Sequence, residues 1–332
     1  MATSMLKRLP DDNLRFDLGW RGTVNHLPMA LVALSRMGAS EERLVDYFGW
    51  WENNRALPRR ESGQAVGEDW QRHIGDASMF AALSDHFRER ILDRGSAAVI
   101  TSAFPVLSPG IAAAAFHGLI RLAYGIEADH AGEIAAGLAT LCSRYVDLGL
   151  KFDGRSTTSV EASFGRLADA IDRATFTGQG IIGRMLAAAS DRRFQAAISV
   201  PPIKLGVLDE IARACISLYW QEPNFKILHM VTATHAARVL FGRFPSLASE
   251  SAILALWGAV CAAYASVGAP PLKGLAPQPN SIAWDKILAD AVKSDDDHVI
   301  KMSYTCRCGA EHHRNPLYQA VAARLVAVGS ST

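Results

Sequence analysis

Alanine and leucine recur at three- and four-residue intervals along almost the whole chain. This spacing places apolar side chains on one face of an α-helix, whereas the alternating β-branched runs that indicate strands are nearly absent. Helix signals are frequent: Ser40 precedes Glu-Glu-Arg-Leu as a cap, Ser108-Pro109 places a cap before a first-turn proline, and Gly149 follows a helical run as a stop. We therefore predict an all-α fold of about a dozen helices.

Three stretches lack a helical pattern and are expected to be loops, over residues 51–69, 151–160 and 268–280. The last is rich in proline but is punctuated by leucine, which is typical of an ordered loop crossing one domain rather than of a linker. Composition does not shift along the 332 residues, and no repeat of fixed period is present. We interpret residues 1–332 as one large helical domain, with a division near Lys151 as the alternative.

Charge and cysteine content exclude several classes of partner. Lysine and arginine (34) nearly balance aspartate and glutamate (33), so no basic field would attract nucleic acid. Charged residues interrupt every long apolar stretch before membrane-spanning length, and the N-terminus lacks the apolar run of a signal peptide. The five cysteines are odd in number, which suits a reducing cytosol. We expect a cytoplasmic protein with a small neutral or aromatic partner, without nucleic acid or membrane, and with its oligomeric state open.

Four histidines lie in apolar, helix-like stretches far apart in the sequence: His26, His117, His229 and His298. A single histidine of this kind is most often a core residue that is hydrogen-bonded to a nearby carbonyl. Four together favour a shared task, because imidazole is the commonest metal ligand and buried ring nitrogens need partners. Lys301 follows His298 by one helical turn, in a helix whose first turn holds three aspartates. A capped surface helix with an extended lysine is the alternative for that segment.

The helix around His117 also carries Arg121 and Tyr124, four and seven residues later on the same face. An imidazole, a guanidinium and a phenol in line are more typical of a pocket around a metal or a polar ligand than of a plain core. A further helix is expected over residues 225–241, where His229 and His235 are six residues apart and cannot face one site. We predict His229 for the site and interpret His235 as a bystander on a wetter face.

The remaining histidines and several short motifs are assigned no chemistry. The histidines are His73, His86 and His130, which have acidic or amide neighbours and are expected at the surface, and His312 and His313, which lie in a polar turn. Residues 178–183 match the dinucleotide pattern Gly-x-Gly-x-x-Gly, but no strand precedes them, so we interpret them as a turn between helices. Cys306 and Cys308 with the two following histidines match structural zinc sites poorly.

Taken together, these segments resemble the questin oxidase-like family. The matching segments cover most of the chain in the family's order and are Asn25-His26 with residues 31–34 and 37–39, residues 116–127, residues 228–232 and residues 297–301. The segment 116–127 is the most specific of them. The resemblance implies an enzyme of aromatic polyketide metabolism that oxidatively opens a ring of an anthraquinone-type substrate.

The resemblance also implies a metal centre. A structurally characterised member is a non-haem iron dioxygenase, with iron held by four histidines and a lysine that is carboxylated on its amine. Matched by motif, those ligands fall on His26, His117, His229, His298 and Lys301. A buried lysine near a dication favours the neutral amine, which can add carbon dioxide and become an anionic oxygen ligand. Five protein ligands around an octahedral metal leave one position open, which is enough for dioxygen but not for a chelating co-substrate.

Three functional hypotheses follow. The first is an Fe(II)-dependent oxygenase that cleaves or oxidises a polycyclic aromatic, anthraquinone-like substrate with dioxygen, with Arg121 and Tyr124 as catalytic-site groups that orient the substrate or support the ligands. The second is a Baeyer–Villiger-type monooxygenase that uses NADPH and no metal, as family members were first described. The third is a non-catalytic helical ligand-binding protein; it predicts the loss of a matched ligand residue, and none is lost. The chain is shorter than the fungal members, which leaves the substrate open.

Overall fold

The computed structural model describes residues 2–20, 23–60, 63–152, 154–274 and 282–329 of the chain. Within these ranges the predicted all-α fold is confirmed, with sixteen α-helices, four short 3₁₀ helices and one small hairpin. The hairpin pairs β1 (Gly19–Trp20) with β2 (Thr23–Val24) in antiparallel fashion. The helices outnumber the expected dozen because several are too short to show a clear period in the sequence, such as the six-residue α10 (Arg192–Ala197).

The helices of the first half of the chain are α1 (Ala2–Asn13), α2 (Leu27–Arg36), α3 (Glu41–Asn54), α4 (Phe80–Arg94), α5 (Ser96–Leu107), α6 (His117–Ala128), α7 (Ala131–Ser143) and α8 (Val160–Ile171). Those of the second half, besides α10, are α9 (Gly180–Ala189), α11 (Val207–Gln221), α12 (Phe225–Arg243), α13 (Glu250–Ala265), α14 (Trp284–Lys293), α15 (Asp297–His313) and α16 (Pro316–Gly329). The 3₁₀ helices are η1 (Trp70–His73), η2 (Ala77–Met79), η3 (Ser108–Gly110) and η4 (Pro245–Leu247). No described helix combines the length and the apolar composition needed to cross a bilayer.

Local sequence signals locate some helix ends and miss others. Ser40 caps α3 as predicted, since its Oγ accepts a hydrogen bond from the Arg43 amide at 3.1 Å. Ser108 does not cap an α-helix; it opens η3, and its Oγ donates to the Pro105 carbonyl instead. Gly149 does not stop a helix, because α7 has already ended, and it lies in the following loop with φ of +62°.

The predicted loops are largely confirmed. Helix α3 extends into the first of them as far as Asn54, and α8 begins only after residue 159. Residues 268–274 are non-helical as predicted, whereas the rest of that loop, over 275–280, lies outside the described residues. The described loops therefore fall where proline, glycine and polar residues interrupt the helical pattern.

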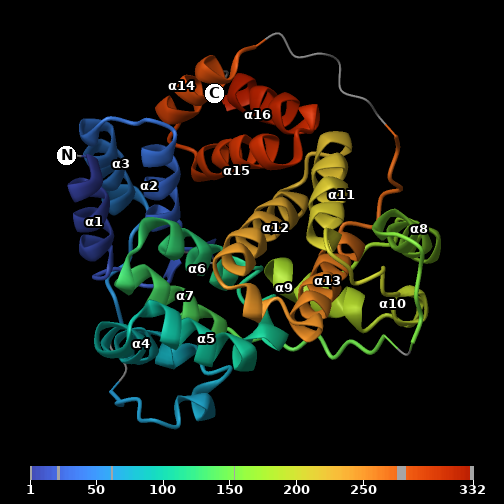
Figure 1. Cartoon of the computed structure of the whole chain (residues 1–332), viewed down its shortest axis with the longest axis horizontal. Helices are drawn as coiled ribbons and strands as arrows, with labels where there is room; N and C mark the ends of the chain where they lie inside the picture. Colours follow the sequence, from blue (N-terminus) through green and yellow to red (C-terminus); the bar gives the residue numbers. More distant parts are fainter. Residues whose placement is uncertain (1, 21–22, 61–62, 153, 275–281, 330–332) are drawn as a thin grey trace.

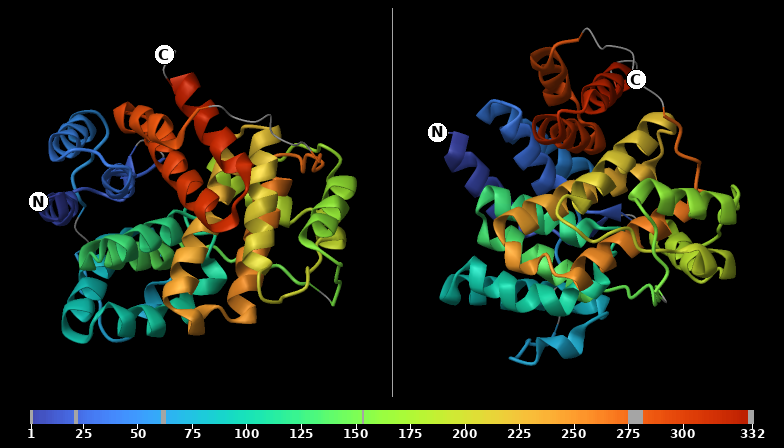
Figure 2. Two further views of the ribbon diagram at one scale, coloured as in Figure 1. Left: turned by 45° about the horizontal axis from the view of Figure 1, so that its top comes forward. Right: turned by 45° about the vertical axis from the view of Figure 1, so that its right-hand side comes forward.

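Helices from the two ends of the chain lie side by side. Figure 1 shows α1, α2 and α3 next to α14, α15 and α16, and the turned views in Figure 2 keep these two groups adjacent. Helix α2 packs on α6 and α15, and α12 packs on the same two helices, which gives a closed ring of contacts. One continuous apolar cluster contains residues from both sides of Lys151. The ring of α2, α6, α12 and α15 joins early, middle and late parts of the chain around one place.

The close packing of α6 on α7 depends on glycine. A Cβ on Gly137 of α7 would lie 2.6 Å from the Leu122 Cα of α6, and one on Gly125 of α6 would lie 2.7 Å from the Ile134 amide nitrogen. Since interiors are packed without free space, a side chain at either position would push the two helices apart. The glycines therefore fix how closely α6 approaches α7.

Candidate metal centre

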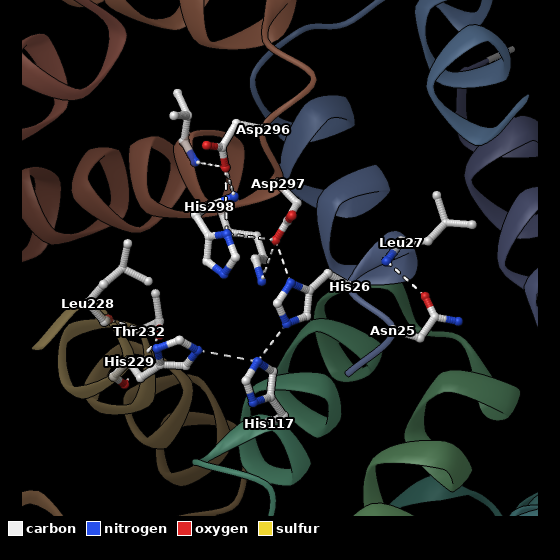
Figure 3. A network of polar contacts seen from close by, with 12 residues as sticks. Asn25, His26, Leu27, His117, Leu228, His229, Thr232, Asp296, Asp297 and His298 are labelled. Atoms are coloured by element: carbon white, nitrogen blue, oxygen red, sulfur yellow. Dashed lines mark hydrogen bonds and ion pairs between the residues drawn. The ribbon is translucent and has the colours of Figure 1, made fainter. Parts of the chain in front are cut away.

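Four helices bring the four predicted histidines together (Figure 3). His26 immediately precedes α2, His117 opens α6, His229 lies in the first half of α12, and His298 is the second residue of α15. The first three are buried, and the side chain of His298 is 23% exposed. Because these four helices form the closed ring of contacts, histidines from both ends of the chain converge.

An unusual backbone turn presents His117. The three residues before it, Ala114, Ala115 and Phe116, have positive φ values of 51°, 56° and 70°. Left-handed backbone costs a residue with a side chain about 1–2 kcal/mol, so the surrounding packing must balance this strain. The Ala114 carbonyl accepts a hydrogen bond from His117 Nδ1, which fixes the ring with Nε2 facing away from the turn.

The Nε2 atoms of three histidines form a short chain. His26 Nε2 lies 2.6 Å from His117 Nε2, which in turn lies 3.3 Å from His229 Nε2. The rings of His26 and His117 are stacked, with 4.6 Å between their centroids. The ring of His298 meets that of His26 edge-on at 5.0 Å between centroids. All four imidazoles thus border one small volume, as Figure 3 shows.

In each ring Nδ1 faces an oxygen atom, so Nε2 is the nitrogen that is available to a ligand. His26 Nδ1 donates to the Asp297 carboxylate, and His229 Nδ1 donates to the Phe225 carbonyl at 2.7 Å. His298 Nδ1 lies 3.3 Å from Asp297 Oδ2, and its Nε2 is buried without a hydrogen-bond partner among the described residues. Such contacts at Nδ1 set the tautomer of metal-binding histidines and leave a lone pair on Nε2.

Asp297 connects the histidines to Lys301. Its Oδ2 accepts the hydrogen bond from His26 and lies 3.3 Å from Lys301 Nζ, and the Lys301 side chain is only 5% exposed. His26, Asp297 and His298 each offer one possible ligand atom, and these atoms lie within 4.8 Å of one another. The sequence does not single out Asp297, because an aspartate at this position is expected in the first turn of any helix.

Burial keeps His26, His117 and His229 neutral. It lowers the pKa of His26 to about 4, with a further contribution from Lys301, and it lowers the pKa values of His117 and His229 well below their usual range. Burial likewise lowers the pKa of Lys301, although Asp297 opposes this effect. Burial would raise the pKa of Asp297, but interactions with His26 and Lys301 outweigh it and hold that pKa well below its usual range. Neutral imidazoles and an ionised carboxylate are the states that bind a cation.

These features fit a divalent transition metal. The His298 Nε2 is buried and unpartnered in the described structure, a situation that costs about 1–3 kcal/mol unless a ligand satisfies the group. Sites rich in imidazole suit iron, zinc, copper and nickel, whereas magnesium and calcium prefer oxygen ligands. The residues present could therefore hold a transition metal such as iron, zinc, copper or nickel.

A cavity of about 680 Å³ opens beside His26 and His117. This volume is within the range of about 300–1,000 Å³ that small-molecule sites occupy. Phe225 forms part of its wall, and the Phe225 ring lies 4.6 Å from the ring of His229 and 4.7 Å from that of His298, centroid to centroid. Phe225 is about half exposed, so it contacts two site histidines and also reaches solvent. The cavity gives a ligand access to the histidines.

Arg121 and Tyr124 do not line this cavity. Arg121 pairs with Glu133 of α7, donating from Nε to Oε2 at 2.7 Å and from Nη2 to Oε1 at 3.2 Å, and both side chains are buried. The ring of Tyr124 packs near those of Tyr304 and His235. The geometry thus offers neither residue a direct contact with a ligand in the cavity, and their supporting role stays a prediction.

A buried chain of hydrogen bonds connects Arg121 to the backbone around His26. Glu133 Oε1 accepts from Asn13 Nδ2 at 3.1 Å, and Asn13 Oδ1 accepts from Asn25 Nδ2 at 2.9 Å. The side chain of Asn25 then accepts from the first backbone amide of α2 at 3.0 Å. His26 lies between Asn25 and that amide, so Arg121 can influence the site through the position of His26.

Three histidines that were expected at the surface are buried instead, namely His73, His86 and His130. Their polar neighbours in sequence do not decide burial, because an imidazole can bury its ring once one nitrogen has a local partner. His86 accepts from Arg90 Nε at 3.0 Å, and His130 Nδ1 accepts from the Glu133 amide at 3.1 Å as the cap of α7. His235 is buried too, contrary to the expected wetter face, and its Nδ1 accepts from Arg238.

The last two histidines are helical rather than in a turn. His312 and His313 end α15, and their ring nitrogens lie 3.1 and 3.8 Å from Asp209 of α11. Cys306 is buried and Cys308 is partly buried, and both are free thiols. Neither belongs to the cluster that Asp209, His312 and His313 form. In the described structure, the cysteines and histidines of this segment therefore do not form a joint site.

Comparison with known proteins identifies a family for the chain. No match was found among curated proteins. The model of the questin oxidase-like family matches residues 23–306. This range contains His26, His117, His229, His298 and Lys301, and with them α2, α6 and α12 and the part of α15 up to residue 306. The chain therefore belongs to the questin oxidase-like family.

Proposed function

We propose that the chain is a non-haem iron-dependent oxygenase that uses dioxygen to oxidise or cleave a polycyclic aromatic, anthraquinone-like substrate. The proposal is carried by the four histidines, whose Nδ1 atoms face oxygen atoms while their Nε2 atoms border one volume. The family name supports an oxidase acting on a polyketide-like small molecule. The cavity beside the histidines supports a ring system as the substrate.

Iron would be held by His26, His117, His229 and His298, and it would supply the one-electron chemistry that dioxygen requires. The chain's own residues prepare this site. Asp297 accepts a hydrogen bond from the Nδ1–H group of His26 and so keeps the His26 Nε2 unprotonated. Burial excludes water from His26, His117 and His229, which strengthens their interaction with a cation.

Lys301 completes the proposed ligand set as a carboxylated lysine. Burial favours the neutral amine that adds carbon dioxide, whereas Asp297, 3.3 Å from Nζ, favours the charged amine. A dication in the site would shift this balance toward the carbamate, because it attracts an anionic oxygen ligand. We expect a carbamate signal in the ¹³C NMR spectrum of iron-free, zinc-loaded protein supplied with ¹³C-bicarbonate, and its loss in Lys301→Arg.

Metal content and oxygen uptake of the purified full-length chain test the proposal. We expect about one iron per chain, as a single site requires, and oxygen uptake on addition of a hydroxylated anthraquinone without NADPH. Consumption of NADPH in step with substrate, unaffected by a chelator, would favour the metal-independent monooxygenase instead. A folded protein that takes up no iron on reconstitution and consumes no oxygen would contradict the proposal.

A further inference from the structure

The cavity beside the histidines carries positive charge at its other end. Arg60 and Arg144 line it together with Asp17. The same three residues also line a second cavity, of about 500 Å³, whose lining includes neither His26 nor His117. The two arginines therefore lie where the cavities meet, away from the histidines.

The charge of this arginine pair is only partly compensated. Asp17 is the acidic member of the described lining; its Oδ1 accepts from the Gly19 amide at 3.1 Å, and its Oδ2 lies 4.0 Å from Arg60 Nε. Arg144 is exposed and forms no ion pair within the described part of the chain. In the described lining, two guanidinium groups against one carboxylate give a net positive charge, whereas the imidazoles of His26 and His117 in the same lining are neutral.

The glycine motif at residues 178–183 contributes to the wall of this cavity. A Cβ on Gly178 would lie 2.3 Å from the carbonyl carbon of Gly183, so the turn folds tightly onto the start of α9. Residues 179–182, which include Ile181 and Ile182, line the cavity. The first turn of α9 contains no acidic residue, so nothing in that turn offsets the positive charge of the arginines.

We infer that this cavity binds an aromatic anion, that is, a polycyclic ring system bearing a carboxylate or an ionised phenol. The negative group lies against Arg60 and Arg144, whose guanidinium groups donate charge-assisted hydrogen bonds to it. The rings lie along Ile181, Ile182 and Phe225 and reach toward the histidines. The charge of the two arginines thereby decides which end of the bound ligand faces the proposed metal site. The inference rests on the proposed function for the ring system, but binding requires neither iron nor oxygen.

Two anthraquinones that differ in charge test it. Isothermal titration of the metal-free full chain at neutral pH compares anthraquinone-2-carboxylate with the neutral anthraquinone-2-carboxamide. We expect the carboxylate to bind about tenfold or more tightly, as charged hydrogen bonds provide. In the Arg60→Gln/Arg144→Gln double variant the carboxylate should lose this advantage, whereas the affinity for the amide should stay unchanged. The two ligands should therefore bind about equally. Arg166→Gln, at an exposed position of α8, removes one charge elsewhere and should keep the preference.

Several outcomes would overturn the inference. These are equal affinity of the wild type for the two ligands, a preference that survives in the folded double variant, and binding of neither ligand. Displacement of the carboxylate by an equal concentration of inorganic phosphate would also contradict it, since the site would then take any small anion. Iron content and oxygen uptake are measured independently, so failure of this inference is distinguishable from failure of the proposed function.

Discussion

His26 and His117 face each other with 2.6 Å between their Nε2 atoms. Both rings donate from Nδ1, His26 to Asp297 and His117 to Ala114, so each Nε2 carries a lone pair. Two lone pairs at this distance repel each other, and a cation near both converts the repulsion into attraction. This pair is therefore the part of the structure that a bound cation would stabilise most directly.

Replacing His117 by alanine is expected to abolish metal binding, because it removes the imidazole that lies between His26 and His229. His312→Ala is the matched control, since His312 contacts Asp209 at the other end of α15. Elemental mass spectrometry of both purified variants should find metal lost in the first and kept in the second. A folded His117→Ala protein with full metal content would contradict the assignment.

Asp297→Asn is expected to weaken metal binding about 10–100-fold, as the loss of a group that orients a ligand typically does. The asparagine keeps the shape of the side chain but removes the negative charge that faces His26 and Lys301. Asp295→Asn is the control, because Asp295 is exposed and pairs with Arg43. Titration against a chelator of known affinity measures the effect, and equal affinities in the two variants would disprove this role of Asp297.

The three- and four-residue spacing of apolar residues predicted much of the fold, but it did not predict a left-handed turn. The expected helix over 225–241 is observed as α12 (Phe225–Arg243), because a long run with sustained apolar spacing has few alternatives. The turn at Ala114, Ala115 and Phe116 could not be predicted, since alanine favours right-handed helix in isolation. Its conformation depends on packing against helices that are distant in the sequence.

The candidate site was predictable only where burial could be inferred from neighbours in the sequence. The apolar neighbours of His229 indicated burial correctly, whereas the polar neighbours of His130 hid a buried ring. The partners Asp297 and Glu133 were not predictable, because the side chain that faces His26 or Arg121 is decided by how separate helices pack. Metal binding itself stays a prediction.

Breaking the buried pair of Arg121 and Glu133 is expected to destabilise the chain strongly. Arg121→Met leaves the Glu133 carboxylate buried without its main partner, which typically costs about 3–5 kcal/mol of unfolding free energy. Adding Glu133→Gln should recover much of this loss, since glutamine is neutral and can still accept from Asn13. Urea unfolding of both variants measures the difference. A loss below about 1 kcal/mol in Arg121→Met would show that the pair behaves like an exposed one.

Alanine is expected to have opposite effects at two helical glycines. Gly137→Ala should lower the unfolding free energy by about 1–3 kcal/mol, because its Cβ would lie 2.6 Å from the Leu122 Cα and force α6 and α7 apart. Gly165→Ala in α8 should raise it by up to about 1 kcal/mol, because no atom lies within 4 Å of the added Cβ and alanine favours helix. Thermal and urea unfolding of the two variants give the comparison, and equal signs would refute the close-packing argument.

His235 is expected to contribute to loss of stability in acid. Burial, with a further contribution from Arg238, lowers the pKa of His235 to about 3. The unfolded chain binds the proton near pH 6.5, so this contribution to stability is complete above that pH and is lost as the pH falls toward about 3.

His235→Gln cannot take up the proton, and its side-chain oxygen can still accept from Arg238. The unfolding free energy of the variant, measured by urea unfolding between pH 7 and pH 4.5, should therefore fall less steeply than that of the wild type, by up to about 1.4 kcal/mol per pH unit. Parallel pH profiles would show that His235 is protonated in the folded chain as readily as in the unfolded chain.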